Sequence, residues 1–245
     1  MLEEIILAVV QGITEFLPVS SSGHMALISN LISEPNLFFM VAMHVASLLA
    51  VLIYFRKDIW ELLHFKKEKN WHFYKIVLIG IIPAGLVGYF FSDWIDKAIH
   101  NYFFIGLGFL FTSLVLIETK LRKSNKKKIS LKDSLIIGLS QIFALFPGVS
   151  RSGTTTSVGI FRKINPKEAG KFSFFMFIPL MIGAMLTQLE GFYFNTSLLV
   201  SFIVCFIVSL FSLGLFFKTL KNGKFWMFAV WTTLMAILSF SLGVL

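Results

Sequence analysis

The sequence predicts an all-α integral membrane protein with six transmembrane helices and two re-entrant helical hairpins in an inverted-topology repeat. Three observations lead to this prediction. The 245 residues are 56% hydrophobic and only 14% charged, whereas soluble domains carry about 25% charged residues. Six apolar segments have the length of membrane spans, which take roughly 20 residues. Two further apolar segments are too short to cross a bilayer, and each ends at a proline and a run of serine and glycine.

The first half of the chain begins with one of these short segments. Residues 2–16 form an apolar helix candidate that Pro18 stops, and a second short piece covers about 25–32. We therefore expect a hairpin that enters and leaves the membrane on one face. The spans that follow it are expected at Leu37–Phe55, Tyr74–Phe91 and about Phe103–Ile117.

The second half repeats this order of elements. Residues 133–146 form another apolar helix candidate that is too short to span, and a proline and a Ser/Gly run follow it. Its return limb is expected to reach Phe161, before the basic pair Arg162 and Lys163. The three remaining spans are expected at 172–189, 198–217 and 225–245.

Two polar loops carry the clearest sign of the repeat. PVSSSGH begins at Pro18 and PGVSRSG begins at Pro147, and both contain a Ser-x-Ser-Gly core. Polar runs at membrane depth are tolerated only where they pack in protein or line a wet cavity, so we expect the two loops to form one internal site. The chain is predicted to be a single membrane domain, 1–245, with repeat halves of about 1–118 and 133–245 joined by a basic cytoplasmic loop, 119–132.

Basic residues give the predicted orientation, because Lys and Arg accumulate in cytoplasmic loops. The connections on one side of the predicted spans hold 20 of the 22 Lys and Arg residues, the opposite side holds only Lys97, and Arg151 lies in the second loop. Both termini are therefore predicted to lie outside. With three spans in each half, the hairpins enter from opposite faces and meet near the midplane, as in inverted-repeat transporters. The same bias explains the net charge of +9, so no nucleic-acid partner is expected.

Gln11 and Glu15 are four residues apart and share one face of the first short helix, next to the loop. A carboxylate at membrane depth is costly unless it meets a cation, a proton or a metal. We therefore expect Glu15 to be functional. The alternative is a structural Glu15 that is hydrogen-bonded or protonated.

The hydroxyl groups of both loops suit a phosphate. A serine run at a helix start most often caps the helix, and we expect that role for at least one serine of the first loop. The same helix starts offer free N–H groups and a positive dipole end to an anion. His24, just past the first loop, can act as an acid or base or bind a metal. The residues expected to bind phosphate are Ser20, Ser22, Gly23, Ser150, Ser152, Gly153, Thr154 and Thr155.

Arg151 is the strongest single signal in the sequence. A guanidinium near mid-membrane needs an anionic partner, and its fork matches phosphate oxygens. Glu15 is the alternative partner in the empty protein. A carboxylate, a histidine, an arginine, hydroxyls and two helix starts together suit phosphoryl transfer. His44, inside the first full span, is interpreted as a residue of the core or as a support of the site.

QGITEFLPVSSSGH (11–24) and PGVSRSG (147–153) resemble the two signature motifs of the undecaprenyl-diphosphate phosphatase family of the bacitracin-resistance type. The resemblance implies hydrolysis of undecaprenyl diphosphate to undecaprenyl phosphate and inorganic phosphate, which recycles the lipid carrier for peptidoglycan and other cell-wall polymers. It also implies a divalent cation, Mg²⁺ or Ca²⁺, and a bacterial cell (inner) membrane protein whose active site opens to the outer, periplasmic face. Bacitracin would compete by sequestering the substrate, and a homodimer is one oligomeric state left open.

The resemblance also implies roles for single residues. Glu15 corresponds to the family's acidic position linked to metal and catalysis, Ser21 to the candidate nucleophile or phosphate-binding serine, and His24 to the catalytic histidine. Arg151 corresponds to the phosphate-binding arginine. Accessory hydroxyls of the family match Ser150 and Thr155.

Gln11 stands where the family has Glu or Gln, and a neutral amide can ligate a metal weakly but cannot serve as a base. In the expected mechanism Ser21 attacks the terminal phosphorus with His24 as base. The alternative is attack by His24, with Ser21 only binding phosphate. A carrier that moves a lipid phosphate without hydrolysing it is the rival class, but the cluster of Ser21, His24 and Glu15 favours an enzyme, because binding alone needs no acid–base pair. Hydrolysis followed by flipping of the product lipid also stays open.

Overall fold

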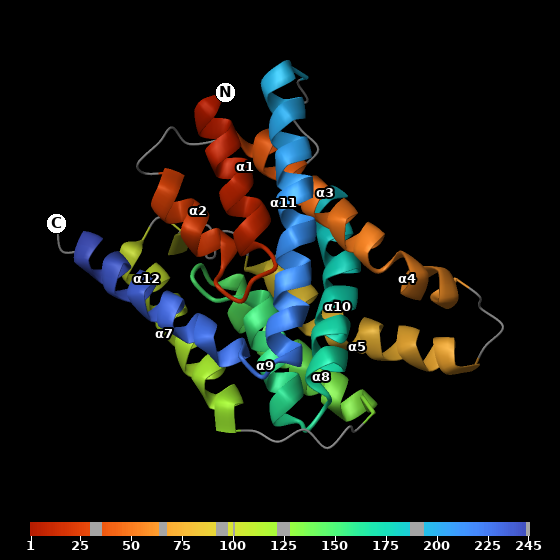
Figure 1. The fold of residues 1–245 in the computed structure, drawn as a ribbon. Coiled ribbons are helices and arrows are strands. Elements are labelled where there is room, and N and C mark those ends of the chain that lie inside the picture. Colours follow the sequence, from red (N-terminus) through yellow and green to blue (C-terminus); the bar gives the residue numbers. More distant parts are fainter. Residues whose placement is uncertain are drawn as a thin grey trace.

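The computed structural model describes residues 1–29, 36–63, 68–91, 98–99, 101–121, 128–186 and 194–243, and these residues form helices without an extended strand (Figure 1). Six of the helical segments are long and apolar enough to cross a membrane. The prediction of an all-α membrane protein with six spans is therefore confirmed. The spanning helices are α3 (Leu37–Tyr54), α5 (Glu68–Phe90), α7 (Tyr102–Glu118), α10 (Pro166–Leu186), α11 (Thr196–Lys221) and α12 (Phe228–Leu242).

Two pairs of shorter helices lie where the sequence predicts hairpins. The first pair is α1 (Leu2–Thr14) and α2 (Ser21–Ser29), and the second is α8 (Leu131–Gln141) and α9 (Arg151–Phe161). In Figure 1 the first pair lies in the upper half of the molecule and the second in the lower half, with their connecting loops close together at the centre. Whether the pairs are re-entrant in a membrane, and whether the two halves are an inverted repeat, stays a prediction.

The helix boundaries differ from the predicted ones in several places. The stretch after α3, expected to be a loop, contains α4 (Arg56–Leu62), and α5 begins at Glu68 rather than Tyr74. Helix α10 begins at Pro166 rather than 172, since the fixed φ of proline suits a first helical position. Helix α2 begins at Ser21 rather than Met25, because a serine caps it. The predicted end of this return limb, near Ile32, lies outside the described residues.

An aromatic core lies directly beside the two loops. Phe16, which follows Glu15 in the sequence, is fully buried and packs edge-on against Phe174 and Phe177 of α10, with ring centroids 5.5 and 6.1 Å apart. Phe174 in turn packs against Phe216 of α11. The loop between α1 and α2 is thereby held against two spanning helices.

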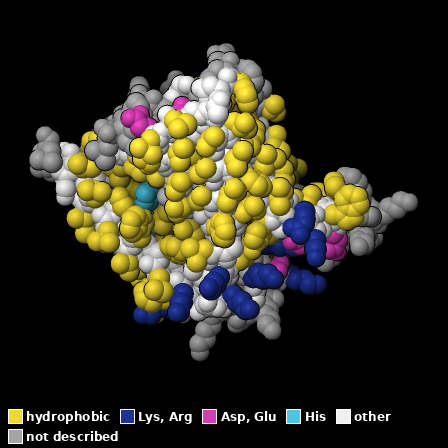
Figure 2. Space-filling view, turned by 45° about the horizontal axis from the view of Figure 1, so that its top comes forward, with side chains coloured by type: hydrophobic (Ala, Val, Ile, Leu, Met, Phe, Trp, Pro, Cys, Tyr) yellow, Lys and Arg dark blue, Asp and Glu magenta, His cyan; other side chains and the backbone are white. Residues whose placement is uncertain are grey.

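The surface has the distribution expected of a protein in a bilayer. A broad apolar area covers the middle of the face shown in Figure 2, and Lys and Arg side chains gather along its lower edge. Many large apolar side chains are exposed on the spanning helices, such as Leu78 of α5 and Phe211 of α11 at 57% and 77%. A water-soluble protein would bury such side chains, whereas lipid solvates them.

Candidate active site

The two polar loops end in helix caps of the same kind. Ser20 precedes α2, and its Oγ accepts a hydrogen bond of 3.3 Å from the backbone N–H of Gly23. Ser150 precedes α9, and its Oγ accepts one of 3.1 Å from the N–H of Gly153. The expected capping role is therefore confirmed for Ser20, and the second loop repeats it.

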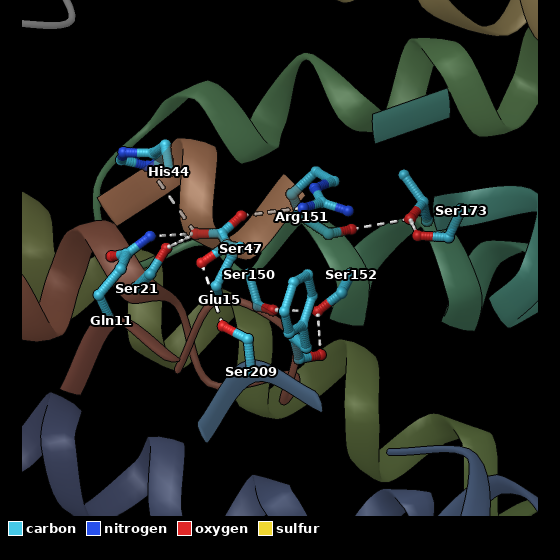
Figure 3. A network of polar contacts seen from close by, with 12 residues as sticks. Gln11, Glu15, Ser21, His44, Ser47, Ser150, Arg151, Ser152, Ser173 and Ser209 are labelled. Carbon is cyan, nitrogen blue, oxygen red and sulfur yellow. Dashed lines mark hydrogen bonds and ion pairs between the residues drawn. The ribbon is translucent and has the colours of Figure 1, made fainter. Parts of the chain in front are cut away.

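Because of these matching caps, Ser21 and Arg151 occupy the same position in the two loops, the first residue of the following helix. Both side chains bind the same carboxylate, that of Glu15 at the end of α1 (Figure 3). Ser21 Oγ donates to Glu15 Oε2 at 2.7 Å, and Arg151 Nη2 donates to Glu15 Oε1 at 3.0 Å. The structure thus brings together three of the four residues predicted to be catalytic.

The Glu15 carboxylate is almost completely buried, with 7% of its side chain exposed. Gln11, one turn earlier on α1, donates from Nε2 to Glu15 Oε2 at 2.9 Å. The oxygen of this amide differs from its nitrogen, because Gln11 Oε1 is buried and, within the described part of the chain, has no hydrogen-bond partner. A buried carbonyl oxygen without a donor is a favourable position for a cation.

Arg151 is held by three groups and keeps one free donor group. Its guanidinium lies 4.1 Å from the ring centroid of Phe177 and 5.9 Å from that of Phe174, so it stacks on the aromatic core as well as pairing with Glu15. Its Nη1 is buried and has no hydrogen-bond partner among the residues that the structure describes. Without a ligand Glu15 is therefore the partner of Arg151, and the N–H groups of Nη1 are able to donate to an anion.

His24 is not placed against Ser21. Its Nδ1 lies 2.8 Å from the carbonyl oxygen of Ser20, and its Nε2 accepts a hydrogen bond of 2.9 Å from the indole N–H of Trp231 on α12. The imidazole and indole rings are parallel within 6°. Both ring nitrogens are thus engaged, and Glu15 rather than His24 contacts the Ser21 hydroxyl. A part for His24 in the reaction stays a prediction.

His44 lies next to Glu15 although the two residues are distant in the sequence. From α3, its Nε2 lies 3.9 Å from Glu15 Oε2, and its Nδ1 lies 2.8 Å from the carbonyl oxygen of Met40. The sequence does contain a signal for it, since an ionisable residue inside an apolar span is by default a candidate for function.

Two of the other hydroxyls predicted to bind phosphate have structural partners. Ser152 Oγ donates to the carbonyl oxygen of Phe16 at 3.0 Å, which ties the second loop to the first. Thr155 Oγ1 donates to the carbonyl oxygen of Arg151 at 2.8 Å and lies 2.6 Å from Ser173 Oγ on α10. These contacts fix the position of Arg151 relative to the first loop.

The remaining predicted phosphate-binding residues differ in environment. Ser22 is exposed and lies 3.3 Å from the capping hydroxyl of Ser20. Thr154 is buried, and its Oγ1 has no hydrogen-bond partner among the residues with described positions. Gly23 packs against the backbone of Gly148, and a Cβ at position 23 would lie only 2.9 Å from the Cα of Gly148. Phosphate binding by any of these groups stays a prediction.

Helix α7 supports the second loop from the other side. Thr112 Oγ1 accepts the backbone N–H of Ser150 at 2.9 Å and lies 3.0 Å from the carbonyl oxygens of Gly108 and Gly148. Gly148 has a φ of +84°, a conformation that glycine adopts without strain. A single hydroxyl therefore holds the turn that leads into Arg151.

Comparisons with known proteins agree with the geometry. Residues 4–238 match the family of the bacitracin resistance protein BacA. The chain is 35% identical to a Thermotoga sp. (strain RQ2) protein over 98% of this chain and all of that protein, and 36% identical to a Methanococcus maripaludis (strain C7) protein over 91% and 92%. A Thermosipho africanus protein is 36% identical over 99% of this chain and all of its own length. All three relatives bear the name undecaprenyl-diphosphatase.

Proposed function

The chain belongs to the bacitracin resistance protein BacA family, and from this membership we propose that it hydrolyses undecaprenyl diphosphate to undecaprenyl phosphate and inorganic phosphate. The relatives named undecaprenyl-diphosphatase, which align over nearly the whole chain, support this activity. The structural observation that carries the proposal is the buried Glu15 carboxylate, hydrogen-bonded on one oxygen to Ser21 and on the other to Arg151. One group thereby joins a nucleophile to a phosphate-binding cation.

In the proposed reaction the Ser21 oxygen attacks the terminal phosphorus. Glu15 Oε2 takes the hydroxyl proton, which it already accepts as a hydrogen bond. The bond from phosphorus to the bridging oxygen breaks, and undecaprenyl phosphate leaves with that electron pair. Glu15 next releases its proton to solvent. Water attacks the phosphoserine and gives a proton to the ionised Glu15, the bond from phosphorus to the Ser21 oxygen breaks, and Glu15 returns the proton to that oxygen as inorganic phosphate departs.

Arg151 and the two helix starts would hold the transferred phosphate. The unpartnered Nη1 of Arg151 supplies donors for phosphate oxygens, and Phe177 keeps the guanidinium plane in place. The first N–H groups of α2 and α9 have no partner within their own helices, and the positive dipole ends favour an anion. These groups act by positioning and by charge neutralisation, which dominate phosphoryl transfer.

The donor groups beside Glu15 fit a divalent cation. Glu15 contributes a carboxylate, and the buried, unpartnered Oε1 of Gln11 contributes a carbonyl oxygen, the ligand type that Mg²⁺ and Ca²⁺ prefer. When bound, such an ion neutralises charge on a diphosphate. We therefore propose a divalent cation at Glu15, with Gln11 as a weaker ligand.

The six apolar spans make the protein a multi-pass membrane protein. We further propose that it resides in the bacterial cell (inner) membrane with both termini outside and the site open to the outer, periplasmic face. Bacitracin, by sequestering the lipid diphosphate, would then compete with the enzyme for its substrate. We also propose that the protein forms a homodimer in this membrane.

The decisive experiment measures phosphate release from undecaprenyl diphosphate by the purified protein in detergent. We expect release by the wild type, loss of release in EDTA with recovery on adding a divalent cation, and no detectable release by Ser21→Ala. Thr233→Ala, which removes a hydroxyl on α12 that contacts Ser113, is the matched control and should keep wild-type activity.

Two results would count against the proposal. Wild-type rates in Ser21→Ala would remove Ser21 as nucleophile. A folded wild type that binds the lipid without releasing phosphate would support a carrier instead.

A further inference from the structure

His44 lies beside Glu15 because α1 and α3 share one part of the core. Leu7 and Ala8 of α1 and Phe39 and Met43 of α3 are buried in the same cluster. This packing brings the His44 Nε2 to 3.9 Å from Glu15 Oε2. The distance is too long for a hydrogen bond, so the two atoms face each other without a bond between them.

The orientation of the His44 ring is set by its other nitrogen. Nδ1 lies 2.8 Å from the carbonyl oxygen of Met40, which can only accept a hydrogen bond, so Nδ1 carries the proton. In the neutral imidazole the lone pair of Nε2 then faces the carboxylate. Two electron-rich atoms that face each other repel, and a positive charge between them would remove this repulsion. A histidine that donates one N–H to a backbone carbonyl and presents the other nitrogen is also the usual form of a metal ligand.

Gln11 adds a third donor on the same side. Figure 3 shows Gln11 and His44 on one side of the Glu15 carboxylate and Arg151 on the other. The Gln11 Oε1 is buried and has no partner in the described ranges of the chain, and a half-turn of the amide exchanges Nε2 and Oε1. The oxygen then lies next to Glu15 Oε2, on the side of His44.

We propose that His44 is a ligand of the divalent cation, together with Glu15 and Gln11, and that this site prefers Mn²⁺ to Ca²⁺. Two ligand atoms of one ion, at bond lengths of about 2.1 Å, lie about 3–4 Å apart, and the 3.9 Å between His44 Nε2 and Glu15 Oε2 falls in that range. An imidazole nitrogen suits first-row transition metals, whereas Ca²⁺ takes oxygen ligands. Mn²⁺ accepts both kinds of donor.

The diphosphate of the substrate completes the coordination. Among the described residues no group of three or more His, Cys, Asp and Glu side chains could hold a metal, and Arg151 already offsets the single charge of Glu15. The protein therefore binds Mn²⁺ weakly by itself and more tightly with a diphosphate, which brings further oxygens and negative charge. The part of the inference that involves the diphosphate rests on the proposed function.

The test detects the ligand directly and needs no turnover. Mn²⁺ is titrated into the full-length protein with and without methylenediphosphonate, whose P–C–P bridge resists hydrolysis, and the bound ion is examined by pulsed electron paramagnetic resonance. We expect ¹⁴N modulation from a coordinated imidazole in the wild type and its loss in His44→Gln. Loss of a ligand should weaken Mn²⁺ binding at least tenfold, since loss of a supporting group alone typically costs about 10–100-fold. Ca²⁺ binding should not change.

The matched control is His72→Gln, which alters an exposed histidine of α5 and should keep the ¹⁴N modulation. Absence of the modulation in wild-type protein with bound Mn²⁺ would overturn the proposal without any variant. Its persistence in His44→Gln would do the same. Phosphate release is measured separately: if His44 binds Mn²⁺ but no phosphate is released, the proposed function fails and this inference stands.

Discussion

At the scale of single residues, the site depends on how Glu15 distributes its bonds. Oε2 accepts from Gln11 and Ser21, and Oε1 accepts from Arg151. A buried carboxylate without such donors would be strongly destabilising, because several kcal/mol of lost hydration must be offset locally. The three bonds make a buried charge tolerable, and one of them directs the hydroxyl of Ser21 at the carboxylate.

Arg151→Lys tests whether the site needs the planar guanidinium with its two terminal nitrogens or only its positive charge. Lysine keeps a cation beside Glu15 but has no second nitrogen in place of Nη1 and no plane to stack on Phe177. We expect phosphate release to fall by at least about 100-fold, the usual cost of losing one donor to a developing charge. Thermal unfolding in detergent should stay close to that of the wild type.

Arg56→Lys is the matched control for this substitution. Arg56 is exposed and donates to the carbonyl oxygen of Ile53, far from the site in sequence. Its variant should release phosphate at the wild-type rate. Activity of Arg151→Lys within threefold of the wild type would show that a single positive charge, without the second nitrogen of arginine, is enough for phosphate release.

The sequence was sufficient to predict that Glu15, Ser21 and Arg151 belong to one site, because a charge at membrane depth must find an opposite charge. The sequence could not predict the contacts of His24 and His44. His24 is near Ser21 in the sequence, but the turn of α2 directs its ring to Trp231. His44 is distant in the sequence, and only the packing of α3 on α1 brings it to Glu15. Local spacing carries no information on such contacts between helices.

At the scale of elements, α7 acts as the support for the second loop. The hydroxyl of Thr112 accepts the N–H of Ser150 and lies within hydrogen-bond distance of the Gly148 carbonyl. Gly108, on the same helix, lets α7 approach the second loop closely because glycine has no Cβ. A Cβ at this position would lie 2.1 Å from the carbonyl oxygen of Pro147, which is too close for any side chain. The position of Arg151 therefore depends on a helix that contributes no side chain to Glu15.

Thr112→Val removes this hydroxyl while keeping the shape of the side chain. The buried N–H of Ser150 then loses its acceptor, which costs about 1–3 kcal/mol. We expect a lower midpoint of thermal unfolding in detergent. Phosphate release should also fall, because the turn before Arg151 is less well held.

Thr112→Ser is the control that keeps the hydroxyl and loses a methyl group. It should retain most of the stability and the activity that Thr112→Val loses. Equal unfolding midpoints for the two variants would mean that the hydroxyl does not hold the loop.

Boundaries of elements were less predictable than their order. The stretch RKDIWEL mixes charges with Trp60 and Leu62, which suggests a loop from composition but forms α4. An apolar span is recognised from its length and hydropathy, whereas a short charged helix beside it depends on where it packs, and here Asn70 donates to the carbonyl oxygens of Glu61 and Leu62. Tertiary contacts override weak local preferences in such segments.

At the scale of the whole molecule, the distribution of charge gives a testable orientation. Lys and Arg lie along one edge of the apolar surface in Figure 2, and basic loops stay in the cytoplasm. Thr196 is the first residue of α11 and Lys224 lies shortly after its last residue, Lys221, so single cysteines at these two exposed positions mark opposite ends of the helix. In intact cells a membrane-impermeant maleimide should label Thr196→Cys, and should label Lys224→Cys only after permeabilisation.

The unmodified protein is the background control, since its single cysteine, Cys205, is fully buried. Labelling of Lys224→Cys in intact cells, without labelling of Thr196→Cys, would reverse the predicted topology. Phosphate release by both variants would show that the substitutions leave the fold intact.

The matching caps at Ser20 and Ser150 have a consequence for how such a site arises by evolution. Each loop offers one position, directly after its cap, whose side chain reaches the same carboxylate, and the chain fills one with Ser21 and the other with Arg151. Two serines there would leave the carboxylate without the counter-charge of Arg151, and two arginines would remove the hydroxyl that the proposed mechanism uses as nucleophile. A pair of identical loops, as in a dimer of two equal halves, therefore could not provide both groups. Joining the halves in one gene lets the two positions diverge, and a difference at this one position separates the attacking group of the proposed mechanism from its anion-binding group.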